Sequence, residues 1–164
     1  MFTVHGTKKL LDRVKPALAD PLAEPDTVLG NWYGTALMWR PQATLFVNEL
    51  TRLPVFVPLA PAKEIGDRIG PQVGRVLEAI GIDIDAAIRE AGAMEQVTWA
   101  KTANRSVIGS MNEFAYLAEA HLANNRIDLF DLSVSLASTP CGPLYSTYSF
   151  PDRAAHAAFD NAYG

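Results

Sequence analysis

One stretch of helical periodicity, beginning near Asn104, constrains this chain more than any other feature. Its apolar stripe comprises Val107, Ile108, Met111, Phe114, Ala115, Ala118, His121 and Leu122. These residues recur at the spacing of one face of an α-helix. The pattern therefore predicts a long amphipathic helix over about 104–125, with its apolar face packed against another layer.

A block of alternating residues supplies that layer. Successive residues alternate between two faces through 33–40 and again through 44–50, where Leu45 and Val47 face opposite to Phe46 and Asn48, and 53–59 forms a third extended segment. Because short turns join these segments, they predict an antiparallel β-meander. Pro54 and Pro58 cannot donate ladder hydrogen bonds, so we expect the third segment to be an edge strand.

Shorter patterns complete the expected fold. We predict further strands over 2–6 and 94–101, and a proline-rich loop over 16–30. Helices are predicted over 8–15, 63–69, 71–80, 84–91, 128–137 and 152–162, with Pro71 as the first residue of its helix. The 164 residues are then one α+β domain over 1–164, an antiparallel meander with several helices packed on it.

Composition excludes several classes of protein. The chain has one cysteine, which rules out an internal disulfide framework and a multi-cysteine zinc site. Its apolar runs are too short to span a bilayer, and the first residues do not resemble a secretory signal, so we expect a cytoplasmic protein with no membrane partner. The net charge is −4, and the one basic cluster, over 8–15, fits the solvated side of a short helix. General nucleic-acid binding is therefore disfavoured.

Four strings in the chain resemble those of a known family. They are Thr-Lys-Lys-Leu-Leu (7–11), Gly-Asn-Trp-Tyr (30–33), Asn-Glu (48–49) and Asn-Arg-Ser-Val-Ile-Gly-Ser-Met-Asn (104–112). Together they resemble a family of small bacterial proteins described as a domain of unknown function. The likeness runs from Thr7 to about Pro143 and implies a bacterial protein of one domain. It brings no assigned activity, cofactor or catalytic residue.

The start of the long helix is the candidate ligand site. A helix N-terminus presents free N–H groups and the positive end of its dipole, and both favour an anion. The candidate binding residues are Lys101, Thr102, Asn104, Arg105, Ser106 and Ser110. Gly109 leaves the same side of the helix open to close approach. The alternative is that Asn104 or Ser106 is only the N-cap of the helix and Arg105 a solvated or packing residue.

Other chemistries have weaker support. Cys141 is a candidate nucleophile with His121 or His156 as its base, but the spacing places no base beside it, which favours a structural cysteine. Ser110 lacks the surroundings of a nucleophile elbow. The isolated histidines predict no metal site and nothing predicts a cofactor, so the catalytic residues stay unassigned.

Two functions follow from these patterns. The first is a non-catalytic binding or interaction module, whose acidic second half suits a protein partner. The alternative is an enzyme or sensor that binds a phosphate- or carboxylate-bearing small molecule at the start of helix 104–125.

Overall fold

The computed structural model describes residues 1–20, 22–124, 127–144 and 150–163. It is an α+β fold, as predicted. The elements in chain order are β1 (Phe2–Gly6), α1 (Lys8–Val14), β2 (Trp32–Leu37), β3 (Ala43–Asn48), β4 (Pro54–Pro58), the 3-10 turn η1 (Ala62–Glu64), α2 (Ile65–Ala79), α3 (Ile84–Ala93), β5 (Val97–Lys101), α4 (Arg105–Asn124), α5 (Leu129–Ala137), the 3-10 turn η2 (Gly142–Leu144) and α6 (Pro151–Tyr163).

The strands form one mixed sheet in the order β4-β3-β2-β1-β5. The predicted antiparallel meander is correct for β2, β3 and β4, but β1 pairs in parallel with both β2 and β5. The difference arises from the connections. Long segments that contain helices join β1 to β2 and β4 to β5, and such crossovers return the chain in the same direction, which short turns cannot do.

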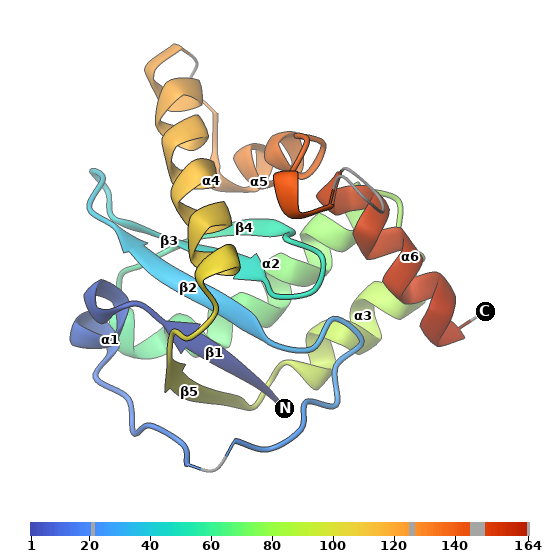
Figure 1. Ribbon diagram of the computed structural model, residues 1–164, viewed down its shortest axis with the longest axis horizontal. Coiled ribbons are helices and arrows are strands. Elements are labelled where there is room, and N and C mark those ends of the chain that lie inside the picture. The colour runs from blue at the N-terminus through green and yellow to red at the C-terminus, as the bar shows by residue number, and fades with distance from the viewer. Residues whose placement is uncertain (21, 125–126, 145–149, 164) are drawn as a thin grey trace.

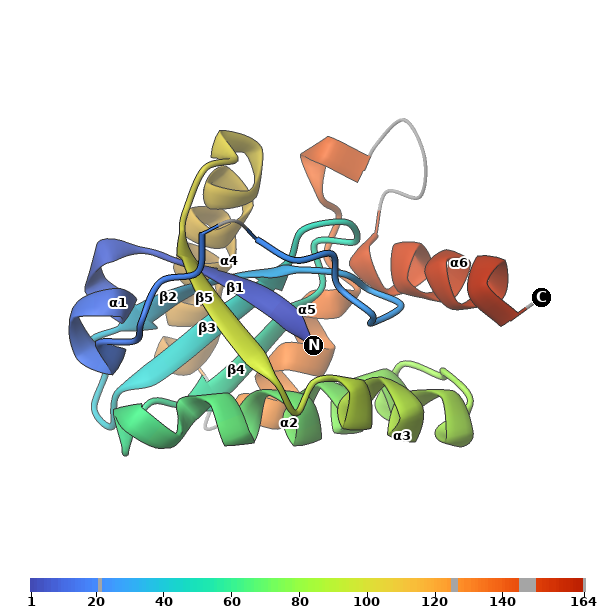
Figure 2. The ribbon, with the colours of Figure 1, turned by 90° about the horizontal axis from the view of Figure 1, so that it is seen from below.

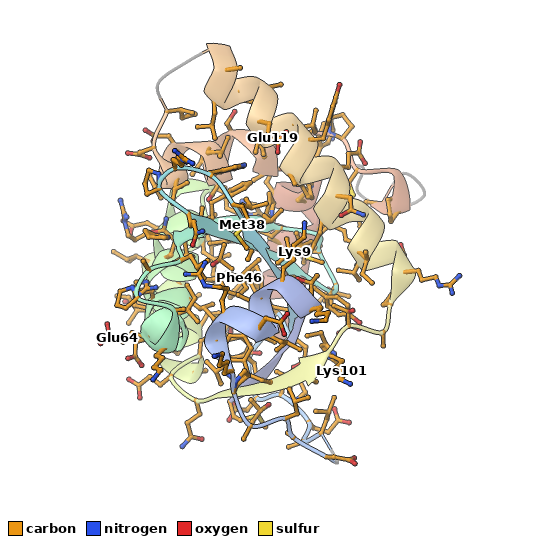
Figure 3. The ribbon with its side chains drawn as sticks, turned by 90° about the vertical axis from the view of Figure 1, so that its left-hand side faces the viewer. Lys9, Met38, Phe46, Glu64, Lys101 and Glu119 are labelled. Carbon is orange, nitrogen blue, oxygen red and sulfur yellow. The ribbon has the colours of Figure 1, made fainter. Side chains whose placement is uncertain are left out.

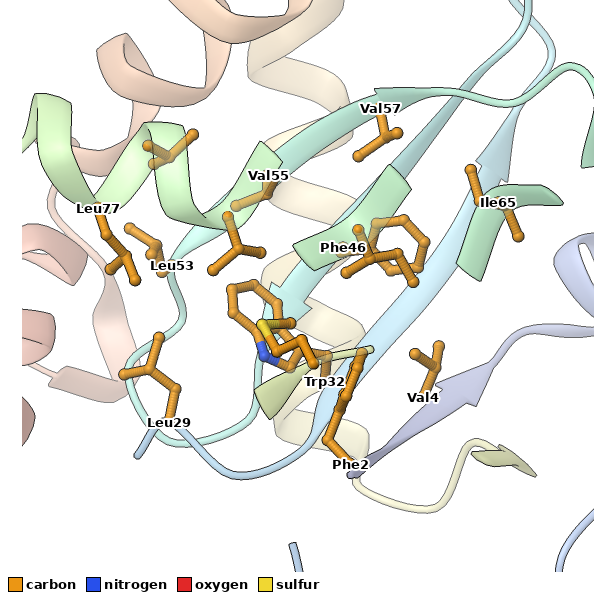
Figure 4. Close-up of a cluster of buried hydrophobic side chains, with 14 of the residues drawn as sticks. Phe2, Val4, Leu29, Trp32, Phe46, Leu53, Val55, Val57, Ile65 and Leu77 are labelled. Atoms are coloured by element: carbon orange, nitrogen blue, oxygen red, sulfur yellow. The ribbon is translucent and has the colours of Figure 1, made fainter. Parts of the chain in front are cut away.

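Helices cover both faces of this sheet. In Figure 1, α4 crosses in front of the strands and α2 lies behind them, and Figure 2 shows α2 and α3 along one side. The core on the α2 face gathers buried side chains from the sheet around Trp32 and Phe46 (Figure 4). On the other face, Val107, Met111 and Phe114 of α4 pack with buried residues of β2, β3 and α5. The amphipathic helix predicted over 104–125 is thus confirmed through its last described residue, and it packs on the sheet as expected.

The edge position predicted for the third segment of the meander is also confirmed. β4 has a strand neighbour on one side only. On its open side, the Phe56 N–H donates to Ser133 Oγ of α5 at 2.8 Å, and the Phe56 carbonyl accepts from Gln72 of α2 at 3.1 Å. Side chains from two helices therefore satisfy backbone groups that a sixth strand would otherwise pair with.

The prediction that Pro71 begins a new helix is wrong. Pro71 lies inside α2, which runs without a break from Ile65 to Ala79. An internal proline costs a helix about 3 kcal/mol. The helix buries five large apolar side chains on both sides of the proline, and each contributes about 1.5–3 kcal/mol: Ile65, Ile69, Val73, Val76 and Leu77. Burial of one continuous face therefore outweighs the lost hydrogen bond.

The glycines near Pro71 serve packing between helices of the same chain. A Cβ atom on Gly70 would lie 2.8 Å from the Ala91 carbonyl oxygen, so α3 can approach α2 closely only because Gly70 has no side chain. α3 itself continues to Ala93, beyond the end predicted at Ala91. Within the described part of the chain, no helix combines the length and the apolar character needed to cross a membrane.

Candidate functional site

The carboxyl ends of β1 and β5 define the most unusual point of the sheet. The two strands are parallel neighbours, and their last residues, Gly6 and Lys101, are paired. After β1 the chain enters α1, whose Leu10 and Val14 join the core on the α2 face. After β5 it enters α4, which packs on the opposite face. In open α/β sheets, ligands bind where the connections of adjacent parallel strands diverge in this way.

A cavity of about 520 Å³ lies at this divergence. We call it the β1–β5 crevice. The strand ends contribute Gly6, Lys101 and Thr102, and α1 with the loop after it contributes Lys8, Leu11, Asp12, Lys15, Pro16 and Leu18. Figure 3 views this side of the molecule, with α1 facing the reader and Lys101 beside it. The volume of the crevice is within the range of pockets that hold small organic ligands.

The glycine where β1 ends allows Leu11 of α1 to lie close to the strand. A Cβ atom on Gly6 would lie 2.9 Å from Leu11 Cδ2. The bare backbone therefore lets α1 fold back tightly against the strand end, which positions the helix as one wall of the crevice.

Exposed lysines from separate segments, Lys8, Lys15 and Lys101, line the crevice. Lys8 Nζ lies 2.7 Å from Asp12 Oδ2, one turn along α1. Among the described residues, the only other ion pair joins the Met1 ammonium to Asp26, so Lys15 and Lys101 have no acidic partner. Lys15 also has φ 53° and ψ 51°, a left-handed conformation that a helix end usually assigns to glycine.

The loop that forms the outer wall is attached to β5. The Ala19 N–H donates to the Trp99 carbonyl at 2.9 Å, and Leu18 forms an isolated parallel bridge with Trp99. Pro16 precedes this attachment and restricts the backbone where the chain leaves α1. The wall is therefore held in place by β5 without a ligand.

The six residues predicted to bind a ligand fall into two groups. Lys101 and Thr102 line the crevice. Asn104 caps α4, because its Oδ1 accepts from the Ser106 and Val107 N–H groups at 2.9 and 3.3 Å. The Asn104 N–H donates to the Tyr33 hydroxyl at 2.9 Å, which fixes the start of the helix over the sheet.

The remaining three residues do not line the crevice. Arg105 is exposed, and its side chain forms no hydrogen bond or ion pair with another described residue. Ser106 Oγ accepts from Arg52 at 3.2 Å. Ser110 is buried and donates to the Ser106 carbonyl at 3.2 Å. The predicted set is therefore not brought together in one pocket.

Sequence reasoning missed Arg52, a buried cation beside the start of α4. Its guanidinium donates to the Glu49 carbonyl as well as to Ser106, while its Nε is buried without a partner among the described residues. Burial lowers the pKa of the Arg52 guanidinium, and the neighbouring Cys141, Glu49 and Tyr33 oppose that shift. The side chain thus joins the turn after β3 to the first turn of α4.

Cys141 lies in the same buried region. Its Sγ is 3.8 Å from Ser110 Oγ, and the residue is 3% exposed. Burial raises the pKa of the thiol, although Ser110 and Arg52 act in the opposite direction. Because the thiolate is the nucleophile, a raised pKa supports the structural interpretation of this cysteine.

Histidines and acidic residues do not gather into a metal site in the described residues. His156 Nε2 lies 2.6 Å from the Ile80 carbonyl oxygen, at the contact between α6 and the end of α2. His5 is stacked on Tyr33 with ring centroids 4.7 Å apart, and its Nδ1 is 2.9 Å from the Lys101 carbonyl oxygen.

A helical pattern could have revealed the other half of the crevice. Lys8, Leu11 and Asp12 are spaced to share one face of α1, Lys15 follows the last residue of this helix, and all four line the cavity. The prediction that the basic cluster over 8–15 lies on the solvated side of a short helix agrees with the exposure of Lys8, Lys9 and Lys15. The sequence does not show that β5 lies beside this side of the helix.

The comparison with curated proteins and the comparison with solved structures give no match. A family model described as "Domain of unknown function (DUF6933)" matches residues 3–154, nearly the whole chain. This confirms the resemblance to a domain of unknown function. The chain belongs to that family.

Proposed function

We propose that this protein binds a small molecule bearing a phosphate or carboxylate group in the β1–β5 crevice. The observation that carries the proposal is the convergence of Lys8, Lys15 and Lys101 on one cavity at the carboxyl ends of diverging parallel strands. An anion in this cavity would supply a counter-charge to Lys15 and Lys101, which form no ion pair with another described residue.

This proposal keeps one part of the site predicted from the sequence and moves the rest. Lys101 and Thr102 remain candidate binding residues. Lys8 and Lys15 take the place of the residues predicted at 104–110. Asn104 and Ser106 already hold the start of α4 in place, which supports a structural role for them. Binding without turnover is proposed, in keeping with the non-catalytic binding module predicted from the sequence.

Thermal unfolding with added anions tests the proposal. The variants are Lys15→Met and Lys101→Met, and the probes are inorganic phosphate, phosphate monoesters and simple carboxylates. A ligand at about a hundred times its dissociation constant should stabilise the wild type by about 2.7 kcal/mol. Both variants should lose most of this stabilisation, and the ligand should be recovered chemically unchanged.

Lys9→Met and Arg105→Met are matched controls. Each removes an exposed cation next to a crevice segment without altering the cavity lining. Both controls should respond to the anion as the wild type does. An equal loss of response in controls and crevice variants would contradict the proposal, as would the absence of any stabilising anion. The latter result would make a protein partner the better hypothesis.

A further inference from the structure

We infer that the anion is the phosphate monoester of a molecule with an apolar body, an inference that rests on the proposed binding function. Two features of the crevice lead to it. One is the number of charges left unpaired in the lining, and the other is the apolar surface beside them.

The charges fit a dianion. The lining lysines outnumber the one lining aspartate by two, and the Lys8–Asp12 pair leaves Lys15 and Lys101 without an ion pair to any residue that the structure describes. A phosphate monoester carries a charge of about −1.5 to −2 at neutral pH. A carboxylate or a phosphodiester carries a single charge and would leave one ammonium without a counter-charge.

The apolar surface fits an organic body. Leu11, Pro16 and Leu18 line the crevice beside the lysines, and Leu18 is 46% exposed. Inorganic phosphate would fill little of a cavity of about 520 Å³ and would leave this surface in contact with water. A flat apolar group on the ester oxygen would cover the leucines, and burying apolar surface is favourable.

The wall that carries Leu18 is held in place before any ligand binds. The bond between the Ala19 N–H and the Trp99 carbonyl fixes it against β5 at 2.9 Å. A preformed wall reduces the ordering that binding requires, so the leucine contact contributes to affinity.

Calorimetric titration with matched probes tests the inference. Phenyl phosphate supplies the dianion and the apolar body, methyl phenyl phosphate keeps the body with a single charge, benzoate replaces the phosphate, and inorganic phosphate lacks the body. We expect phenyl phosphate to bind at least about tenfold more tightly than each of the others. The Leu18→Ser variant should bind phenyl phosphate with an affinity close to its affinity for inorganic phosphate. Leu22→Ser, which changes an exposed leucine of the same loop outside the crevice, should have no effect.

Each failure has a different meaning. Equal binding of phenyl phosphate, its methyl ester and benzoate would overturn the monoester inference while leaving anion binding intact. Equal binding of phenyl phosphate and inorganic phosphate, or no effect of Leu18→Ser, would overturn the apolar body. Failure of every probe to bind would overturn the proposed function itself, and this inference with it.

Discussion

The backbone of Lys15 is left-handed where α1 ends, and this residue also supplies one of the two unpaired cations of the crevice. A residue other than glycine in this conformation lowers the free energy of unfolding by about 1 kcal/mol relative to glycine. Arg52 is the other non-glycine residue with positive φ among those described, at 62°. Its guanidinium, however, holds the turn after β3 against α4, whereas Lys15 makes no comparable side-chain contact.

Replacing Lys15 by glycine should therefore separate stability from binding. We expect Lys15→Gly to raise the free energy of unfolding by about 0.5–1 kcal/mol, because the strain is removed, and to lose the response to phosphate monoesters. Chemical denaturation and titration of the same samples check both effects. Arg52→Gly relieves the same kind of strain but removes buried hydrogen bonds, so it should be destabilised. A Lys15→Gly protein that is less stable and still binds normally would contradict this account.

At the scale of the element, the sequence predicts what local periodicity controls. The long helix, as far as Asn124, and the edge strand with Pro54 are confirmed, since each depends on residues a few positions apart. Pro71 shows the limit, because the burial that keeps α2 continuous comes from a sheet formed by distant parts of the chain. The parallel pairing of β1 with β2 likewise could not be predicted, because the proline-rich loop that follows α1 does not indicate in which direction the chain returns to the sheet.

Glu90 of α3 should make the stability of the fold depend on pH. The Glu90 carboxylate is 2% exposed and accepts from the Val28 and Leu29 N–H groups at 2.7 and 2.9 Å, so it holds the loop before β2. Burial raises the pKa of this carboxyl, and the two backbone hydrogen bonds only partly oppose it. The folded state therefore binds the Glu90 proton more tightly than the unfolded state. The contribution of Glu90 to stability should be fully present at low pH and fall as pH rises from about 4.3, the usual unfolded value, through the raised folded pKa.

A Glu90→Gln variant isolates this effect. At acid pH, the free energy of unfolding of this variant should be about 1–3 kcal/mol lower than that of the wild type, because the amide cannot accept from both the Val28 and Leu29 N–H groups. The stability difference between wild type and variant should then narrow as pH rises, since only the wild type has the titrating group. Denaturation across pH 4–8 measures the difference, with exposed Glu78→Gln as the control that should follow the wild type. A difference that widens with pH would show that the Glu90 pKa is lowered instead.

At the scale of the whole molecule, the crevice exists because two parallel strands send their connections to opposite faces of the sheet. Lys101 and Lys15 belong to distant parts of the chain and line one cavity because β5 pairs with β1. Lys101 and Thr102, which precede a recognisable helix start, line this crevice, but the sequence prediction grouped them with their neighbours in the chain. The face of α1 that completes the site could not be matched to them without the strand order.

An NMR titration with phenyl phosphate tests the central claim most directly, because it locates the ligand on the folded protein. We predict the largest backbone amide shifts at Gly6, Lys15, Leu18 and Thr102, which line the crevice. Ser106 and Gly109, at the start of α4 but outside the crevice lining, should shift little. Largest changes at Ser106 and Gly109, or no saturable change at the crevice residues, would contradict the claim that this chain binds an anion between β1 and β5.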